Sequence, residues 1–475
     1  MTARKLESDH PPLLGQIPTK LIGLAWPIAL SMLSYSVMTA VDTLFVGRIG
    51  AEAIAAVGLG GLISFTLLTF GMGLLRSGKV IVAHAVGASR QREVPGLAAA
   101  TVVVSLLSTV GTCLVTLAAV PFLGQAFHEP KANQLIVSYV VIRSVALPLV
   151  LVATALRELS QGVGDSRGPM WAAVSANLVN IPLNALFVLH CGWGVAGSAW
   201  ANVLAQLVDL ACLAWQRRDW LRELTRVKWP LVKLITLRGW PLGAEMFLDV
   251  SAFSALGLIL ARLGAIEMAS HQIALQICHL SILPIIALGE AASVMVGQAA
   301  GARRLDQVPR ILQVAILSGV IFSTSTGLVL LGFPLAIVSA FTPDPAVQRL
   351  TAIVLYVVVG FQIAFSLYCI GKCGLRALGD IRFVAIATVT SAWICTPPLA
   401  LIFGRALGWG VVGGWCGLAI EITLASLVYW VRYERGTWQK HLGTLDLPES
   451  AYFARNDVEC EVSGDSLSLG VRPLL

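Results

Sequence analysis

Charged side chains are scarce in this chain. Asp, Glu, Lys and Arg make up 12% of its 475 residues, whereas apolar residues make up 57%. A soluble globule of this length carries more charge than that on its surface. Apolar runs of about 20 residues, long enough to cross a bilayer as a helix, follow one another along the sequence. The composition therefore predicts an all-α integral membrane protein with many spans.

The chain also lacks the local motifs of several enzyme classes. It contains no HExxH motif and no nucleotide-binding glycine loop. None of its nine cysteines has CxxC spacing, and the closest pair, Cys369 and Cys373, lies within an apolar run. We therefore expect no enzyme activity, no resident metal and no cofactor, and we interpret the cysteines as small apolar residues.

A tandem duplication organises the sequence, because residues 24–58 recur as residues 238–272 at a shift of 214. The same shift relates Trp26-Pro27 to Trp240-Pro241, and GASR at 87–90 to GARR at 301–304. Farther along, GDSR at 164–167 corresponds to GDIR at 379–382, and GWGV at 192–195 to GWGV at 408–411. The two halves should therefore share one fold.

Each half contains six apolar runs that could span a membrane. In the first half they lie near 20–46, 52–80, 94–119, 133–157, 168–190 and 195–216, and in the second near 235–261, 267–297, 309–333, 346–371, 382–404 and 411–432. An even number of spans per half makes the repeats parallel. The predicted parts are a cytoplasmic segment (1–19), a six-helix lobe (20–216), a linker (217–234), a second lobe (235–432) and a flexible tail (433–475).

Basic residues give the orientation, since Lys and Arg are retained on the cytoplasmic side of a membrane. With the N-terminus inside, 25 of the 33 basic residues fall on inner segments and five on outer ones. We therefore expect both termini to be cytoplasmic in a multi-pass plasma membrane protein, with a basic linker suited to anionic membrane lipids. The net charge of +7 then indicates membrane orientation, and no nucleic-acid partner is expected.

Short motifs at corresponding places in both halves point to a family. They are DTLFVG (42–47), GA (87–88), QGVGDSR (161–167), ASHQIAL (269–275), SVMVG (293–297) and GA (301–302). The chain resembles the multidrug and toxic compound extrusion (MATE) family, in its bacterial NorM-like branch, over nearly its whole length. The resemblance implies a monomer with two lobes in a V, located in the bacterial inner membrane. It also implies export of small cationic or amphipathic substrates, including other xenobiotics, against inward H+ or Na+.

Asp42 is the leading candidate for ion coupling, because a carboxylate inside a membrane span is costly and usually faces a cavity or a partner. Asn177, Asn180 and Asn184 share one face of the fifth span. Burial disfavours the charged form of a carboxylate, so Asp42 could exchange a proton, or its oxygens could bind Na+ with the amides. By resemblance the cation lies at Asp42 with Asn180 and Asn184. Asp42 could instead be an interfacial charge, and the amides could only join helices.

The coupling ion is expected to be H+ ahead of Na+. In members of the family that this chain resembles, the position of Asn184 is often Asp, and the amide removes a charge from the site. The Asp that accompanies a second-lobe cation in other members matches Phe365 here, which argues against a sodium site in that lobe.

Glu245 and Asp249 stand four residues apart on the seventh span and should share a face. We assign them to a substrate cavity that attracts cations. Gln272, in the eighth-span motif, and Tyr35, the first-lobe counterpart of Asp249, are assigned to the same cavity.

Arg76 and Glu290 are related by the shift of 214 and carry opposite charges. Positions related by a pseudo-two-fold axis can meet on it, so we predict an ion pair between the lobes. For Lys79 and His84 the simpler expectation is that they extend to the headgroups. Pro27 and Pro241 lie early in their spans and are predicted hinges, although proline is also ordinary there.

A second function remains open from the sequence. A flippase for a lipid-linked glycan or another lipid shares this type of fold, and Arg76, Lys79 and Arg143 would suit its anionic headgroup. The acids Asp42, Glu245 and Asp249 favour the cation exporter.

Overall fold

The computed structural model describes residues 14–123 and 130–445, and this part of the chain is helical without any strand. The first lobe contains α1 (Ile17–Gly47), α2 (Ala51–Gly87), α3 (Val94–Leu123), α4 (Pro130–Val145), α5 (Leu147–Val163), α6 (Arg167–Asn184), a π-helical turn (Ala185–His190) and α7 (Gly194–Gln216). The second contains α9 (Trp229–Ala261), α10 (Ala265–Gly301), α11 (Val308–Gly332), α12 (Pro334–Ser339), α13 (Pro345–Ala377), α14 (Ile381–Leu399), a π-helical turn (Ala400–Ala406) and α15 (Gly410–Glu434).

The twelve predicted spans are confirmed within the described residues. Eleven are single helices long and apolar enough to cross a membrane, and the twelfth is the pair α4 and α5, which is bent by 48°. The sequence predicted one straight span there. Pro148, near the start of α5, lacks an N–H group and cannot continue the hydrogen-bond ladder of α4. The corresponding helix of the second lobe, α13, runs unbroken.

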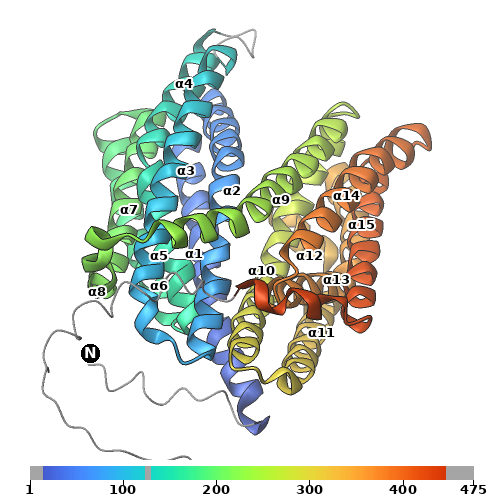
Figure 1. Cartoon of the computed structure of the whole chain (residues 1–475). Coiled ribbons are helices and arrows are strands. Elements are labelled where there is room, and N and C mark those ends of the chain that lie inside the picture. Colours follow the sequence, from blue (N-terminus) through green and yellow to red (C-terminus); the bar gives the residue numbers. More distant parts are fainter. Residues whose placement is uncertain (1–13, 124–129, 446–475) are drawn as a thin grey trace, which may run out of the picture.

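Both lobes repeat the same backbone turns, which confirms the duplication. Ser89 and Arg303, 214 residues apart, have φ of 61° and 60°. Gly164 and Gly379 have φ of 101° and 94°. Figure 1 shows the resulting bundles as a V, apart at one end and together at the other. We call the end where they meet, beside Gly87, the closed end.

The first helix of each lobe crosses to the other lobe near the closed end. Buried residues of α1 up to Ile28 belong to the apolar core of the second lobe. Conversely, α9 contributes residues from Leu231 to Leu242 to the core of the first lobe. Pro27 and Pro241 are buried within these crossing segments. The predicted hinges therefore lie where each helix leaves one lobe and enters the other.

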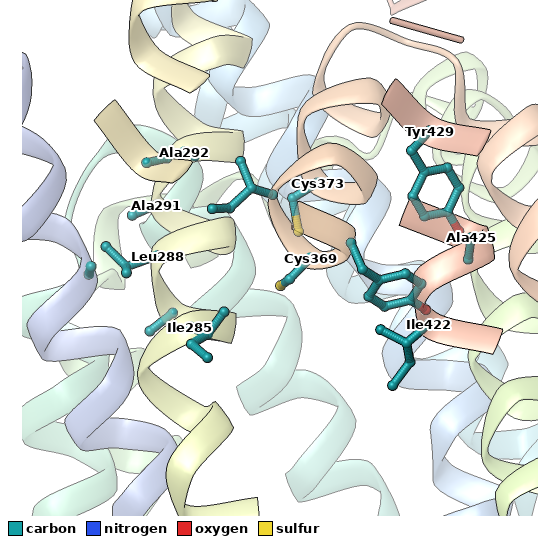
Figure 2. Close-up of a cluster of buried hydrophobic side chains, with 14 of the residues drawn as sticks. Ile285, Leu288, Ala291, Ala292, Cys369, Cys373, Ile422, Ala425 and Tyr429 are labelled. Carbon is teal, nitrogen blue, oxygen red and sulfur yellow. The ribbon is translucent and has the colours of Figure 1, made fainter. Parts of the chain in front are cut away.

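The core of the second lobe lies between α10, α13 and α15. Figure 2 shows Ile285, Leu288, Ala291 and Ala292 on α10, Cys369 and Cys373 on the neighbouring α13, and Ile422, Ala425 and Tyr429 on α15. Both cysteines are buried and free of disulfides. They pack as small apolar residues, since a Cβ added at Gly289 would lie 2.8 Å from the sulfur of Cys369.

Glycines let α2 and α10 meet at the closed end. A Cβ added at Gly87 would overlap the carbonyl oxygen of Gln298, and one added at Gly301 would overlap that of His84. These two contacts are related by the shift of 214. Only glycine allows two helix backbones to approach this closely, so the pseudo-two-fold axis passes through a contact of backbone on backbone.

Two hydrogen bonds between the lobes flank this contact and are again symmetric. His84 Nε2 lies 2.7 Å from the carbonyl oxygen of Ala377, and Gln298 donates to the carbonyl oxygen of Gly162 over 3.4 Å. The expectation that His84 extends to the headgroups is wrong, because its side chain is buried against the second lobe.

Two of the predicted boundaries differ from the elements found. The linker contains a short α8 (Arg218–Leu221) and a 3-10 helix (Arg222–Arg226), and α9 already begins at Trp229 because Pro230 suits the first turn of a helix. Within the predicted tail, Thr437–Leu445 forms a 3-10 helix, with Trp438 and Leu445 buried. Residues 1–13 and 446–475, which include most of the predicted terminal segments, lie outside the described part.

Candidate functional site

Asp42 is enclosed by amides in the interior of the first lobe. Its side chain, on α1, is only 4% exposed. Asn184 and Asn180 of α6 donate to Oδ1 over 2.8 and 3.3 Å, and Asn202 of α7 donates to Oδ2 over 3.0 Å. We call Asp42 and these three amides the amide cage. This geometry does not suit an interfacial charge, since three helices surround the carboxylate and satisfy it with hydrogen bonds.

The cage differs from the predicted set by one residue. Asn177 shares the helical face of Asn180 but donates to the backbone oxygen of Ser34 over 3.1 Å, so it joins α6 to α1 without reaching Asp42. Asn202 takes the third place. Its own oxygen accepts a hydrogen bond from Arg143 of α4, which puts a guanidinium group next to the cage. Asn202 shares a helical spacing with Gln206 and Asp209 along the sixth span, but that spacing alone does not show which spans face each other.

A second polar cluster lies deeper in the same lobe and contains Tyr35. The tyrosine hydroxyl donates to Asp209 Oδ2 over 3.0 Å, and the same oxygen pairs with Arg157 at 2.5 Å. Asp209 is fully buried. The assignment of Tyr35 to a substrate cavity stays a prediction. Arg157 lies within α5, and Asp209 compensates its charge.

The ion pair predicted between the lobes is present, but with a closer partner than expected. Glu290 of α10 lies 2.5 Å from Lys79 Nζ and 3.8 Å from Arg76 Nη1, both on α2. Lys79 also pairs with Glu158 of α5 at 2.7 Å. Since the side chain of Lys79 is only 3% exposed, the expectation that it extends to the headgroups is wrong. Lys79 follows Arg76 by three residues, so both share the face that meets α10.

A cavity of about 460 Å³ opens between the second lobe and α2. Its aromatic lining consists of Phe65, Phe253, Phe361, Phe365, Tyr368 and Trp415. Its charged lining consists of Arg76, Glu245, Asp249, Glu290, Lys372, Arg376 and Glu421. Aromatic walls with a few placed charges are typical of sites for amphipathic small molecules.

The two acids of the seventh span have different surroundings in this cavity. Glu245 is 1% exposed and pairs with Lys372 at 2.9 Å and with Arg376. Its charge is therefore compensated within the second lobe, and its attraction of a cationic substrate stays a prediction. Asp249 keeps 38% of its side chain exposed and lies 3.8 Å from Lys372. Asp249 is the acid that a ligand can reach.

Gln272 does not join this cavity. It is exposed near the start of α10 and lies outside the residues that line the space. Its neighbour His271 is buried and contacts the ring of Trp415, with ring centroids 5.8 Å apart. The eighth-span motif thus packs one residue into the lobe and leaves the next on its surface.

Comparisons with known proteins agree with this two-lobe arrangement. The profile of the MatE family matches residues 27–186 and 241–402, one block in each lobe. The chain is 31% identical over 442 residues to "Probable multidrug resistance protein NorM" of Burkholderia pseudomallei (strain K96243), covering 90% of this chain and 94% of the relative. It is 30% identical over 454 residues to "Multidrug resistance protein NorM" of Burkholderia vietnamiensis, covering 92% and 96%.

Solved structures establish the same fold. The outward-facing conformation of a multidrug resistance MATE family transporter of the MOP superfamily has a TM-score of 0.81 at 20% identity, covering 93% of this chain and all of that one. A MOP superfamily transporter from Pyrococcus furiosus has a TM-score of 0.82 at 19% identity, with the same coverage. From the matching family profile and the relatives at 30% identity or more, the chain belongs to the multidrug and toxic compound extrusion (MATE) family.

Proposed function

We propose that this protein is a secondary active multidrug efflux transporter that exports organic cations or other xenobiotics by antiport, with H+ ahead of Na+ as the coupling ion. The observation that carries the proposal is the buried Asp42 with three amide donors, beside a lobe that holds an aromatic cavity. A lone carboxylate in such a place binds a proton with no further ligand. Na+ needs several oxygens, and the amides present nitrogens to Asp42, so they would have to rotate.

Substrate would occupy the cavity beside α2 and contact Asp249. The aromatic rings supply area for the apolar part of an amphipathic molecule, and cations are attracted to ring faces. Asp249 supplies the charge. The transporter would act as a monomer in the bacterial inner membrane with both termini cytoplasmic, so that the closed end of the V faces the cytoplasm. Bending near Pro27 and Pro241 would let the lobes open at alternate ends.

The lipid flippase is the weaker candidate, because the cations on which it rested are occupied. Lys79 lies between Glu158 and Glu290, and Arg143 donates to Asn202. Arg76 faces Glu290 at 3.8 Å. A pyrophosphate headgroup would have to displace these partners, leaving buried acids unpaired at high cost.

The amide cage gives the first test. Asp42→Asn should lower dye efflux driven by a proton gradient in membrane vesicles by roughly tenfold or more, while expression stays normal. Asn177→Ala is the matched control, because it alters the same face of α6 outside the cage and should keep most efflux. Undiminished efflux by Asp42→Asn, or an equal loss in both variants, would remove Asp42 from its coupling role.

The two acids of the cavity give the second test. Asp249→Asn should weaken binding of cationic dyes to the purified protein but leave binding of neutral substrates and the melting temperature nearly unchanged. Glu245→Gln leaves Lys372 and Arg376 without their main partner, so it should cost about 3 to 5 kcal/mol of stability. Binding assays and thermal unfolding separate the two effects. Equal loss of cationic and neutral ligands in Asp249→Asn would contradict its role.

The charges between the lobes give the third test. Glu290→Gln removes the partner of Lys79 on the second lobe, whereas Glu158→Gln removes its partner within the first lobe. Only Glu290→Gln should favour the state in which the lobes separate beside Gly87. Distances between spin labels on the two lobes report the shift. If both variants match the wild type, the pair does not hold the lobes together.

A further inference from the structure

The segment Thr437–Leu445 runs across the closed end of the V. It follows α15 after a turn at Gly436, whose φ is 64°. Figure 1 shows it as a red ribbon that leaves the second lobe and approaches the first. It contacts α2 of the first lobe as well as α15. We call this segment the strap.

One end of the strap is anchored in the second lobe. Trp438 is 7% exposed, its ring stacks on Tyr433 at 5.9 Å, and its indole N–H donates to the carbonyl oxygen of Tyr433 over 3.0 Å. Leu442 packs against the core of this lobe. His441 Nε2 lies 3.7 Å from Asp380, which also accepts a hydrogen bond from Arg432 over 2.8 Å. Aromatic, apolar and polar contacts thus fix this part.

The other end reaches the apolar core of the first lobe. Leu445 is 1% exposed and belongs to the cluster that contains Val86 of α2, Val94 of α3 and Ile235 of α9. Ile381 of α14 completes this group from the second lobe. Leu445 is therefore buried in a cluster to which both lobes contribute. Burial of a leucine side chain is among the larger single apolar contributions.

The first lobe has no equivalent bridge within the described residues. After α7, the corresponding segment forms α8 and the 3-10 helix Arg222–Arg226, and both pack against α3 of their own lobe. The strap therefore breaks the symmetry of the duplication. Closure at this end depends on the symmetric contact of α2 with α10 and on one segment present only once.

We propose that the strap is a conformational brake, which favours the state closed at this end and must release Leu445 before the ends of α2 and α10 can separate. The proposal rests on the movement of the lobes in the proposed function, not on the substrate or the coupling ion. It assigns residues 437–445 a regulatory role: anything that displaces them would favour opening toward the side on which the strap lies.

The test compares two shortened chains, one ending at Gly436 and one ending at Leu445. The second is the matched control, since it keeps the strap and loses only the residues beyond it. Spin labels at residues 92 and 304, one on each lobe, report the distance at the closed end. They are attached through unnatural amino acids, because the chain has nine cysteines of its own. The chain ending at Gly436 should show a ratio of open to closed molecules about tenfold higher than the control, equivalent to about 1.4 kcal/mol.

Point variants of the full chain keep the test decisive if the shorter chain folds poorly. Leu445→Asn should raise the same ratio, whereas Lys440→Gln, at an exposed position of the strap, should not. If the chain ending at Gly436 and Leu445→Asn both match their controls, the strap is no brake. Because the readout is a distance, this result would leave the efflux proposal standing.

Discussion

A buried carboxylate between two lobes constrains the rest of this structure. Glu290 belongs to the second lobe, but Lys79 and Arg76, its compensating cations, belong to the first. In a low-dielectric interior an unpaired charge is costly, so Glu290 is satisfied only while the lobes touch or while water reaches it. The glycine contact of Gly87 and Gly301 lets the helices approach closely enough. In the proposed function, separation of the lobes would replace this paired arrangement by one in which water reaches Glu290.

Duplication supplied the frame, and the two copies then diverged in polarity. Asp42 of the first lobe corresponds to Leu256 of the second, which is fully buried in an apolar core. The first lobe therefore encloses its carboxylate in amides. In the second lobe Glu245 pairs with Lys372 and Arg376, whereas Asp249 is exposed in an aromatic cavity. In the proposed function one lobe binds the ion and the other the amphipathic molecule, and movement of the V would couple them.

Periodic features of the fold were predictable from the sequence. Apolar runs gave the twelve spans, and the shift of 214 gave the paired lobes and the meeting of Arg76 with Glu290. Local rules failed where a partner from another helix decided the outcome. Lys79 looked able to reach the headgroups, but Glu158 and Glu290 hold it inside. Asn177 and Asn180 share a face but stand about one turn apart along α6, so Asn177 meets Ser34 and Asn180 meets Asp42.

Choices between helices were beyond the sequence for the same reason. The sequence around Tyr35 does not show whether its side chain lines a cavity or binds Asp209, because Asp209 lies on another helix, α7. Leu445 lies in a stretch without apolar periodicity, so the sequence did not predict that it is buried. Its position depends on where α15 ends and on the turn that follows. Pro148 is visible in the sequence as a proline, but the 48° angle between α4 and α5, which both pack against α2, is not.

The central claim is that the proton site at Asp42 and the dye site in the second lobe are coupled, and coupling between sites is reciprocal. The most direct measurement is the proton release that follows binding of a cationic dye to the purified protein in weakly buffered detergent near neutral pH. The account predicts release by the wild type, up to about one proton per dye, and none by Asp42→Asn with dye still bound. Equal release by both proteins would contradict it.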